Sequence, residues 1–128
     1  MTRVAIYIRC GKRDEEGKAS LNEQLNKLTD YCINELKTDN YIIFEDFGYS
    51  FKAKKRPAYS DMMEQIRNKE FTHLLVSDAD RLSRTCKQIL SLTREFAELD
   101  VTFIIPKHSD QLKDFFENML YINKKEKL

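Results

Sequence analysis

The chain has 128 residues, of which 41% are hydrophobic and 34% charged, with a formal net charge of +1, and these values predict one soluble globular domain over residues 1–128. It contains no long apolar run, no basic and apolar leader and no CxxC pair among its three cysteines, which excludes a membrane span, a disulfide framework and a zinc site and predicts a cytoplasmic location. Because nucleic-acid modules are usually more basic, any contact with DNA has to be local.

The first half of the chain alternates between strand and helix patterns. A β-branched and aromatic segment, 3–8, predicts a buried strand, and a polar loop, 9–19, follows it. Ser20 and Glu23 form a capping box that predicts the start of a helix, which continues to about residue 37. The apolar residues of this helix recur with a helical period: Leu21, Leu25, Leu28, Cys32 and Leu36.

A second strand is expected at 41–45, followed by a long loop, 46–56, that contains a basic run. Pro57 is suited to the first position of the next helix, because a proline there removes no helical hydrogen bond. The basic residues of the loop are candidates for contact with a DNA backbone, and a solvated loop is the alternative interpretation. They are Lys52, Lys54 and Lys55.

The second half repeats the alternation, with strands expected at 72–76 and 101–105 and a helix from Thr85 to about residue 99. This order predicts an α/β fold of three layers, in which a mostly parallel sheet has helices on both faces. Ser109 is expected to cap a last, apolar helix that completes the core or forms a dimer interface. The candidate interface residues are Leu112, Phe115, Phe116, Met119 and Leu120.

The segment 77–84 carries two aspartates and two arginines directly after the third strand. Ligands gather at the carboxyl ends of strands in open α/β sheets, and the forked guanidinium group suits a phosphate. Arg81 and Arg84 are three positions apart, so one helical turn would project both from one side. A salt-bridged turn, with Ser83 as a helix cap, is the alternative. Further polar candidates follow the other strands: Tyr7, Arg9, Asp46 and Arg56.

These motifs resemble the N-terminal catalytic domain of the serine recombinases, the group of resolvases, invertases and large serine integrases. The order and spacing agree from about residue 3 to residue 105, and the Asp-Arg-Leu-Ser-Arg motif is the most specific part of the match. The matching segments are Tyr7 to Arg9, Ser20 to Gln24, Asp46 to Ser50, Arg56 to Tyr59 and Asp80 to Arg84.

The resemblance implies site-specific DNA recombination, in which a serine hydroxyl attacks a phosphodiester and arginines stabilise the transferring phosphoryl group. It implies a DNA phosphate backbone as partner, assembly into dimers and tetramers, and no metal or other cofactor. By position, the resemblance assigns phosphate binding to Arg9, Arg81 and Arg84, support of the site to Arg56 and Gln24, orientation of the arginines to Asp80, and the floor of the site to Tyr7.

One residue departs from the family pattern at the position of the catalytic nucleophile. The nucleophilic serine of the family stands two residues after the arginine of the Tyr-x-Arg motif, where this chain has Gly11. Three interpretations follow: a natural pseudoenzyme, a substitute nucleophile such as Cys10 or Ser20, or a glycine that was introduced to inactivate the enzyme. Because successive residues of a strand point to opposite sides, Cys10 is expected to face away from residue 11.

A non-catalytic function on the same fold is therefore the alternative to a recombinase. Such a protein would form dimers, or would assemble with an active recombinase and regulate it without cutting DNA. The chain shows no helix-turn-helix, zinc ribbon or basic arm, so a domain that reads a DNA sequence is not expected within it.

Overall fold

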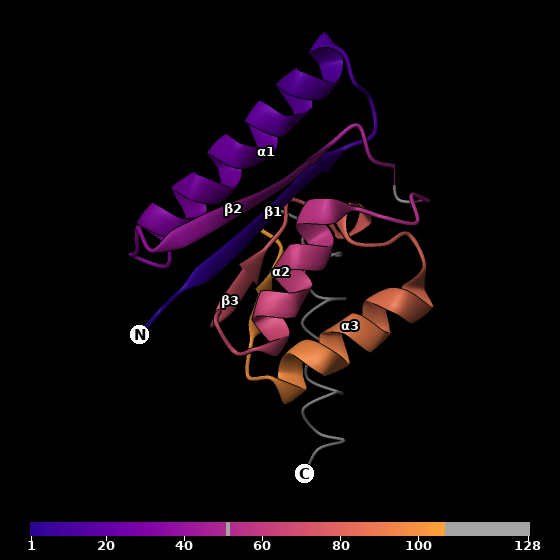
Figure 1. The fold of residues 1–128 in the computed structure, drawn as a ribbon. Coiled ribbons are helices and arrows are strands. Elements are labelled where there is room, and N and C mark those ends of the chain that lie inside the picture. Colours follow the sequence, from indigo (N-terminus) through magenta and orange to yellow (C-terminus); the bar gives the residue numbers. More distant parts are fainter. Residues whose placement is uncertain (51, 107–128) are drawn as a thin grey trace.

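The computed structural model describes residues 1–50 and 52–106. Within these ranges the chain alternates between strands and helices, as Figure 1 shows. The strands are β1 (Val4–Cys10), β2 (Tyr41–Phe47), β3 (His73–Leu75) and β4 (Thr102–Ile104). The helices are α1 (Glu15–Asn34), α2 (Pro57–Arg67), α3 (Cys86–Glu98) and a short 3₁₀ helix, η1 (Ala79–Arg81).

The sheet has the strand order β2-β1-β3-β4, and all three pairings between its strands are parallel. Helix α1 lies on one face, and α2 and α3 lie on the other (Figure 1). This arrangement confirms the predicted parallel sheet with helices on both faces. The predicted C-terminal helix, with Leu112, Phe115, Phe116, Met119 and Leu120, lies outside the described residues.

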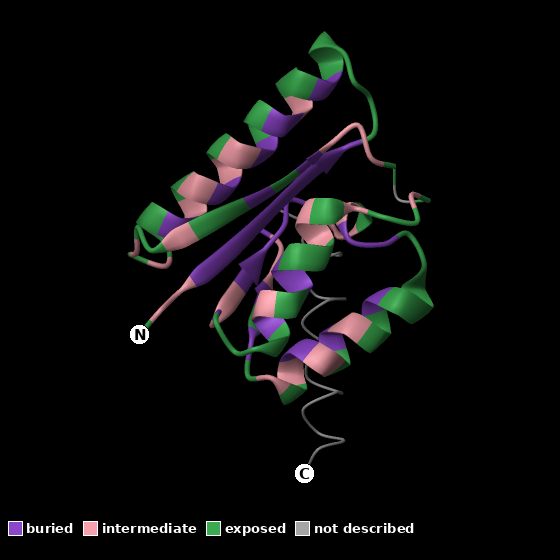
Figure 2. Ribbon diagram, in the orientation of Figure 1, coloured by how far each residue is buried: buried purple, intermediate pink, exposed green. Residues whose placement is uncertain are grey.

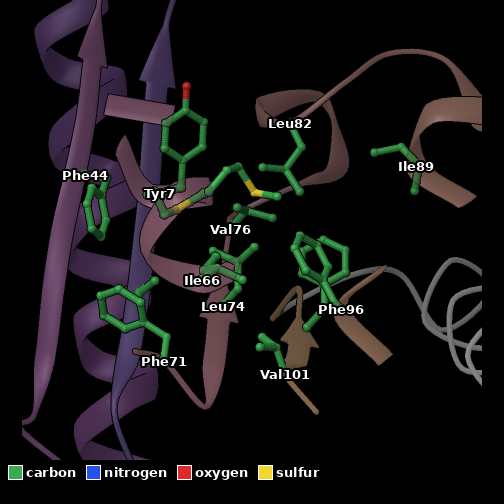
Figure 3. Close-up of a cluster of buried hydrophobic side chains, with 14 residues drawn as sticks. Tyr7, Phe44, Ile66, Phe71, Leu74, Val76, Leu82, Ile89, Phe96 and Val101 are labelled. Carbon is green, nitrogen blue, oxygen red and sulfur yellow. The ribbon is translucent and has the colours of Figure 1, made fainter. Parts of the chain in front are cut away.

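Strand β1 is buried along its whole length, because it is flanked by two strands and covered by helices on both faces (Figure 2). Its side chains alternate between two apolar clusters. Val4, Ile6 and Ile8 pack with α1, whereas Ala5 and Tyr7 join the larger cluster beneath α2 and α3. Figure 3 shows this larger cluster, which contains the labelled side chains of Tyr7, Phe44, Ile66, Phe71, Leu74, Val76, Leu82, Ile89, Phe96 and Val101.

The predicted start of the first helix is wrong by six residues. Asp14 is the N-cap of α1, and its Oδ1 atom accepts a hydrogen bond of 2.9 Å from the backbone N–H of Gly17. Ser20 lies inside the helix, where its hydroxyl accepts a bond of 3.1 Å from the side chain of Gln24. The capping-box pattern at Ser20 is therefore a chance match, because Asp14 already caps the helix six residues earlier.

Gly17 is required by close packing in the first turn of α1. A Cβ atom added there would lie 2.1 Å from the carbonyl oxygen of Lys12, which is backbone and cannot easily move. We expect Gly17→Ala to lower the free energy of unfolding by about 1–3 kcal/mol, although alanine favours helices. Urea denaturation measures this change. Gly11→Ala is the matched control, since its added Cβ would meet no atom closer than 3.8 Å. Equal effects of the two substitutions would show that the contact with Lys12 is unimportant.

Among the described residues, no helix combines the length and the apolar composition that crossing a bilayer requires.

Candidate active site at the carboxyl edge of the sheet

Two arginines from separate parts of the chain converge on the backbone carbonyl of a third. Arg9 is the last residue but one of β1, Arg56 precedes α2, and Arg81 is the last residue of η1. The carbonyl oxygen of Arg81 accepts a bond of 3.1 Å from Nε of Arg9 and one of 2.8 Å from Nη1 of Arg56. A further bond of 2.8 Å joins Nη2 of Arg56 to the carbonyl of Leu82. The predicted convergence of arginines from three loops is thus present in the structure.

Arg9 binds the backbone of both neighbouring loops. Its Nη1 donates to the carbonyl of Tyr49 at 2.9 Å, and its Nη2 donates to that of Asp80 at 2.7 Å. The residue is only 4% exposed. Burial lowers the pKa of Arg9 from its ordinary value, but an arginine keeps its charge in proteins. Arg9 therefore brings a fixed positive charge to this edge and holds the loops that follow β2 and β3.

Gln24, predicted as a supporting residue, holds the backbone of Arg9 from α1. Its Oε1 accepts from the N–H of Arg9 at 3.1 Å, and its Nε2 donates to the carbonyl of Arg9 at 2.9 Å. The same carbonyl also accepts a bond of 3.2 Å from Nη1 of Arg81. Arg9 and Arg81 therefore each bind the other's backbone, and Gln24 fixes the end of β1 beneath them.

Arg81 and Arg84 lie near acidic side chains, and they do not share the predicted helical turn. Helix η1 ends at Arg81, and Thr85 caps α3 directly after Arg84, so the expectation of one common turn is wrong. Nε of Arg81 lies 3.3 Å from Oδ2 of Asp78, and Nε of Arg84 lies 3.9 Å from Oδ2 of Asp80. The side chain of Arg84 is 55% exposed and that of Arg81 25%, so Arg84 is the exposed arginine of the site and Arg81 is half-buried, as Arg56 is.

Asp46 connects the floor of the site to α2. It lies within β2, and its carboxylate is buried. It accepts bonds of 2.7 Å from the hydroxyl of Tyr7, 2.9 Å from the N–H of Ala58 and 3.0 Å from the N–H of Tyr59. Burial, and then this bond to Asp46, raise the pKa of Tyr7, which therefore keeps its proton and donates it to the carboxylate. Arg56 packs on the same part of α2, with its guanidinium carbon 4.1 Å from the centre of the Tyr59 ring.

The role of Asp46 was not apparent from the sequence. The sequence placed it after the second strand, but its carboxylate serves as the N-terminal cap of a helix that begins eleven residues later. The available signal was the absence of a capping side chain next to Pro57, since Arg56 makes no such bond. Asp78 lies beside Arg81, as the alternative interpretation of a salt-bridged turn predicts, but the sequence assigned it no role in the phosphate site.

Gly11 is exposed and occupies a position that can accept a side chain. Its φ is not positive, and a Cβ atom built on it would lie 3.8 Å and 3.9 Å from the Cα and Cβ atoms of Ser50, which is ordinary contact. Neither the backbone nor the packing therefore demands glycine here. The alternative nucleophile Cys10 is buried among the side chains beneath α1, as the alternation of the strand predicts, and Ser20 lies within α1.

The lysines of the loop between β2 and α2, Lys52, Lys54 and Lys55, are exposed. Within the described ranges, acidic, histidine and cysteine side chains form no group of three or more that could hold a metal ion.

Comparison with known proteins agrees with this architecture. Residues 4–125 match the family described as "Resolvase, N terminal domain". A protein of Bacillus subtilis (strain 168) described as "Putative DNA recombinase" is 25% identical over 101 residues, which are 79% of this chain and 20% of that protein. The chain thus spans about a fifth of the length of this relative.

Solved structures show the same fold. The N-terminal catalytic domain of TP901-1 integrase is 28% identical with a TM-score of 0.70, and the alignment covers 98% of this chain and 97% of that one. A resolvase family site-specific recombinase from Streptococcus pneumoniae shares the fold at 20% identity, with a TM-score of 0.65 over 98% of this chain and 90% of that one. Because the family match covers nearly the whole chain and includes every element of the site, the chain belongs to the resolvase N-terminal domain family.

Proposed function

We propose that this chain is a serine-recombinase-type domain that binds a phosphodiester of DNA and does not cleave it, because residue 11 supplies no nucleophile. The observation that carries this proposal is the ordered arginine network beside a residue 11 without a side chain. Arg9 and Arg56 both donate to the carbonyl of Arg81, and Arg81 donates to that of Arg9, whereas Gly11 has neither a hydroxyl nor a structural reason to be glycine.

The four arginines differ in accessibility, since Arg9 is buried, Arg56 and Arg81 are half-buried, and Arg84 is exposed. Arg9 and Arg56 donate to backbone carbonyls and hold the loop that carries Arg81. We assign the direct contact with the phosphate to Arg84, which is exposed, and to Arg81, which is half-buried and lies in the same loop. Asp80 lies close enough to Arg84 to orient it. Gln24 holds the end of β1, and Tyr7 binds Asp46, which caps α2.

The loop before α2 adds exposed lysines to the positive charges of the arginines. Lys52, Lys54 and Lys55 follow Ser50, which lies against Gly11. We propose that they contact the neighbouring DNA backbone, where lysines give affinity that depends on salt and not on base sequence.

The proposed phosphate contact predicts a specific loss of affinity. We expect Arg84→Ala to weaken binding of a short DNA duplex about tenfold at low salt and to reduce the slope of log affinity against log salt by about one. Fluorescence anisotropy at several salt concentrations measures both quantities. Arg94→Ala is the matched control, since Arg94 is an exposed arginine of α3, and it is expected to change affinity less than twofold. Equal losses for the two variants would contradict the assignment of Arg84.

The missing hydroxyl at residue 11 also favours a second function, in which the chain assembles with an active recombinase and regulates it. A subunit that joins the assembly but does not attack DNA would lower the activity of the complex. We expect an excess of this chain to reduce strand cleavage by a cognate active recombinase at least about fivefold, because mixed assemblies contain subunits that cannot attack. A gel assay of cleaved DNA measures the effect. Phe116→Asp, in the predicted interface segment, is expected to abolish the inhibition, and unchanged inhibition would exclude that segment as the interface.

A further inference from the structure

Strand β2 forms one edge of the sheet (Figure 1), and among the described residues β1 is its one neighbouring strand. The N–H of Val4 donates to the carbonyl of Asn40 at 3.0 Å, and Val4 pairs with Tyr41 in the register of the two strands. This pattern directs the backbone groups of the even-numbered residues of β2 toward β1. The N–H and C=O groups of the odd-numbered residues, Ile43 and Glu45 among them, therefore point away from the sheet.

This edge has little protection against contact with another strand. Edge strands are commonly protected by proline, by lysine, by a bulge or by being very short. Strand β2 is seven residues long, contains neither proline nor lysine, and pairs with β1 at seven consecutive positions without a bulge. Ile42 and Ile43 are 37% and 40% exposed on its two faces, and Glu45 is its one exposed charged residue.

The flank of α1 on the side of β2 is uncharged along three successive turns. Lys27 and Asn34 line a groove with Pro106, which follows β4, so that flank of α1 lies on the β4 side. The opposite flank, half a turn away around the helix, lies on the β2 side. It carries Asn22, Thr29 and Ile33. Because Ile33 is 52% exposed and this flank is uncharged there, it can approach an identical flank without repulsion between like charges.

A second copy of β2 matches this edge best in one antiparallel register. When Ile43 lies opposite Ile43 of the other copy, the outward backbone groups of residues 41, 43 and 45 all find partners. Sliding the strands by two residues in one direction would place Glu45 opposite Asp39, and like charges in opposed positions are destabilising. Sliding them by two residues in the other direction would place Ile43 opposite Glu45.

We propose that two copies of this chain associate by antiparallel pairing of their β2 strands, centred on Ile43, with the uncharged flanks of α1 beside the new pair. The sheet then continues from one copy into the other. This surface contains none of the arginines of the candidate active site, and the inference does not depend on the proposed binding of DNA. A strand pair with two helix flanks is smaller than the roughly 1,200 Å² of standard interfaces, so we expect a dimer that dissociates in the micromolar range.

Cysteine cross-linking of the full chain tests the register, in a Cys86→Ser background that removes the exposed native thiol. Opposed residues of a hydrogen-bonded antiparallel pair have Cα atoms about 5.5 Å apart, which suits a disulfide. With diamide as oxidant, we expect Ile43→Cys to form a covalent dimer at least about tenfold faster than Glu45→Cys, the matched control on the same strand. Two copies of residue 45 lie four residues out of register, about 13 Å apart along the strands.

Two further measurements test the same pairing. A mixture of Tyr41→Cys and Glu45→Cys is expected to form the mixed disulfide, identified by mass spectrometry, in preference to either symmetric one. Ile43→Lys places two charges opposite each other in the dimer and an exposed lysine on the monomer, so it is expected to lower the sedimentation mass at high concentration while the circular dichroism spectrum stays unchanged. Asn34→Lys, on the opposite flank of α1, is the control and is expected to sediment as the unaltered chain does.

The outcomes decide the proposal in either direction. Fast cross-linking of Ile43→Cys, together with a loss of association in Ile43→Lys, supports self-pairing of β2. Cross-linking of Ile43→Cys no faster than that of Glu45→Cys would refute it, even if the chain dimerises through another surface. A monomeric mass for the unaltered chain at every concentration up to about 1 mM would also refute it, since micromolar association predicts mostly dimer there.

Discussion

Replacing Gly11 with serine is expected to produce a protein that forms a covalent link to DNA, whereas the unaltered chain forms none. The arginines that would stabilise the transferring phosphoryl group are already in place, and residue 11 has room for the added side chain. Loss of a nucleophile costs many orders of magnitude in rate, so the gain is expected to exceed about a thousandfold. The measurement is the yield of protein–DNA adduct on a denaturing gel, with the domain fused to a DNA-binding module and a nicked substrate that carries its site.

Two controls make this experiment decisive. Gly11→Ala adds a Cβ without a hydroxyl and should yield no adduct, and Gly11→Ser combined with Arg81→Ala should lose most of the gain. An adduct formed by the unaltered chain would refute the proposed absence of cleavage. If Gly11→Ser forms no adduct although it is folded and binds DNA, the site lacks more than the hydroxyl group.

Asp46→Ala is expected to have the largest effect on stability of any single substitution considered for this chain. Its buried carboxylate accepts three hydrogen bonds, two of them from the first turn of α2, which has no capping side chain of its own. Removal leaves the hydroxyl of Tyr7 and two N–H groups unsatisfied and also removes a negative charge from a helix N-terminus. We expect the free energy of unfolding to fall by about 3 kcal/mol, a large part of a typical domain's stability, as measured by urea denaturation.

Two further variants show whether the capping bonds are responsible. Tyr7→Phe removes one of the three bonds and leaves α2 capped, so it is expected to cost about 1 kcal/mol. Asp61→Ala removes an exposed carboxylate of α2 and is expected to cost less than about 0.5 kcal/mol. A loss for Asp46→Ala no greater than that for Asp61→Ala would disprove the capping role.

The sequence predicted the fold well, because the fold depends on local patterns. The apolar run of β1, the proline at the start of α2 and the threonine before α3 each specify an element from a few neighbouring residues. The start of α1 was missed because two local signals competed. The pattern at Ser20 matched a capping box, whereas Asp14 caps the helix with Gly17, a residue usually unfavourable within helices.

The candidate site was predictable in its residues but not in their bonds. Resemblance and strand ends selected Arg9, Arg56 and Arg81, and the structure brings these three together. The partners of the arginines are backbone carbonyls, which every residue has, so no sequence pattern identifies them. The bonds of Asp46 to α2 and the position of Ser50 beside Gly11 likewise depend on tertiary packing.

The central place of β1 in a wholly parallel sheet has a consequence for how the chain folds. Val4 pairs with both Tyr41 and His73, so β1 forms no hairpin with either strand and finds these partners among residues that are synthesised later. Such non-local pairing slows folding, since loops must close before the contacts that stabilise them form. During synthesis this apolar strand is therefore exposed before its partners are made, and exposed apolar strands favour aggregation.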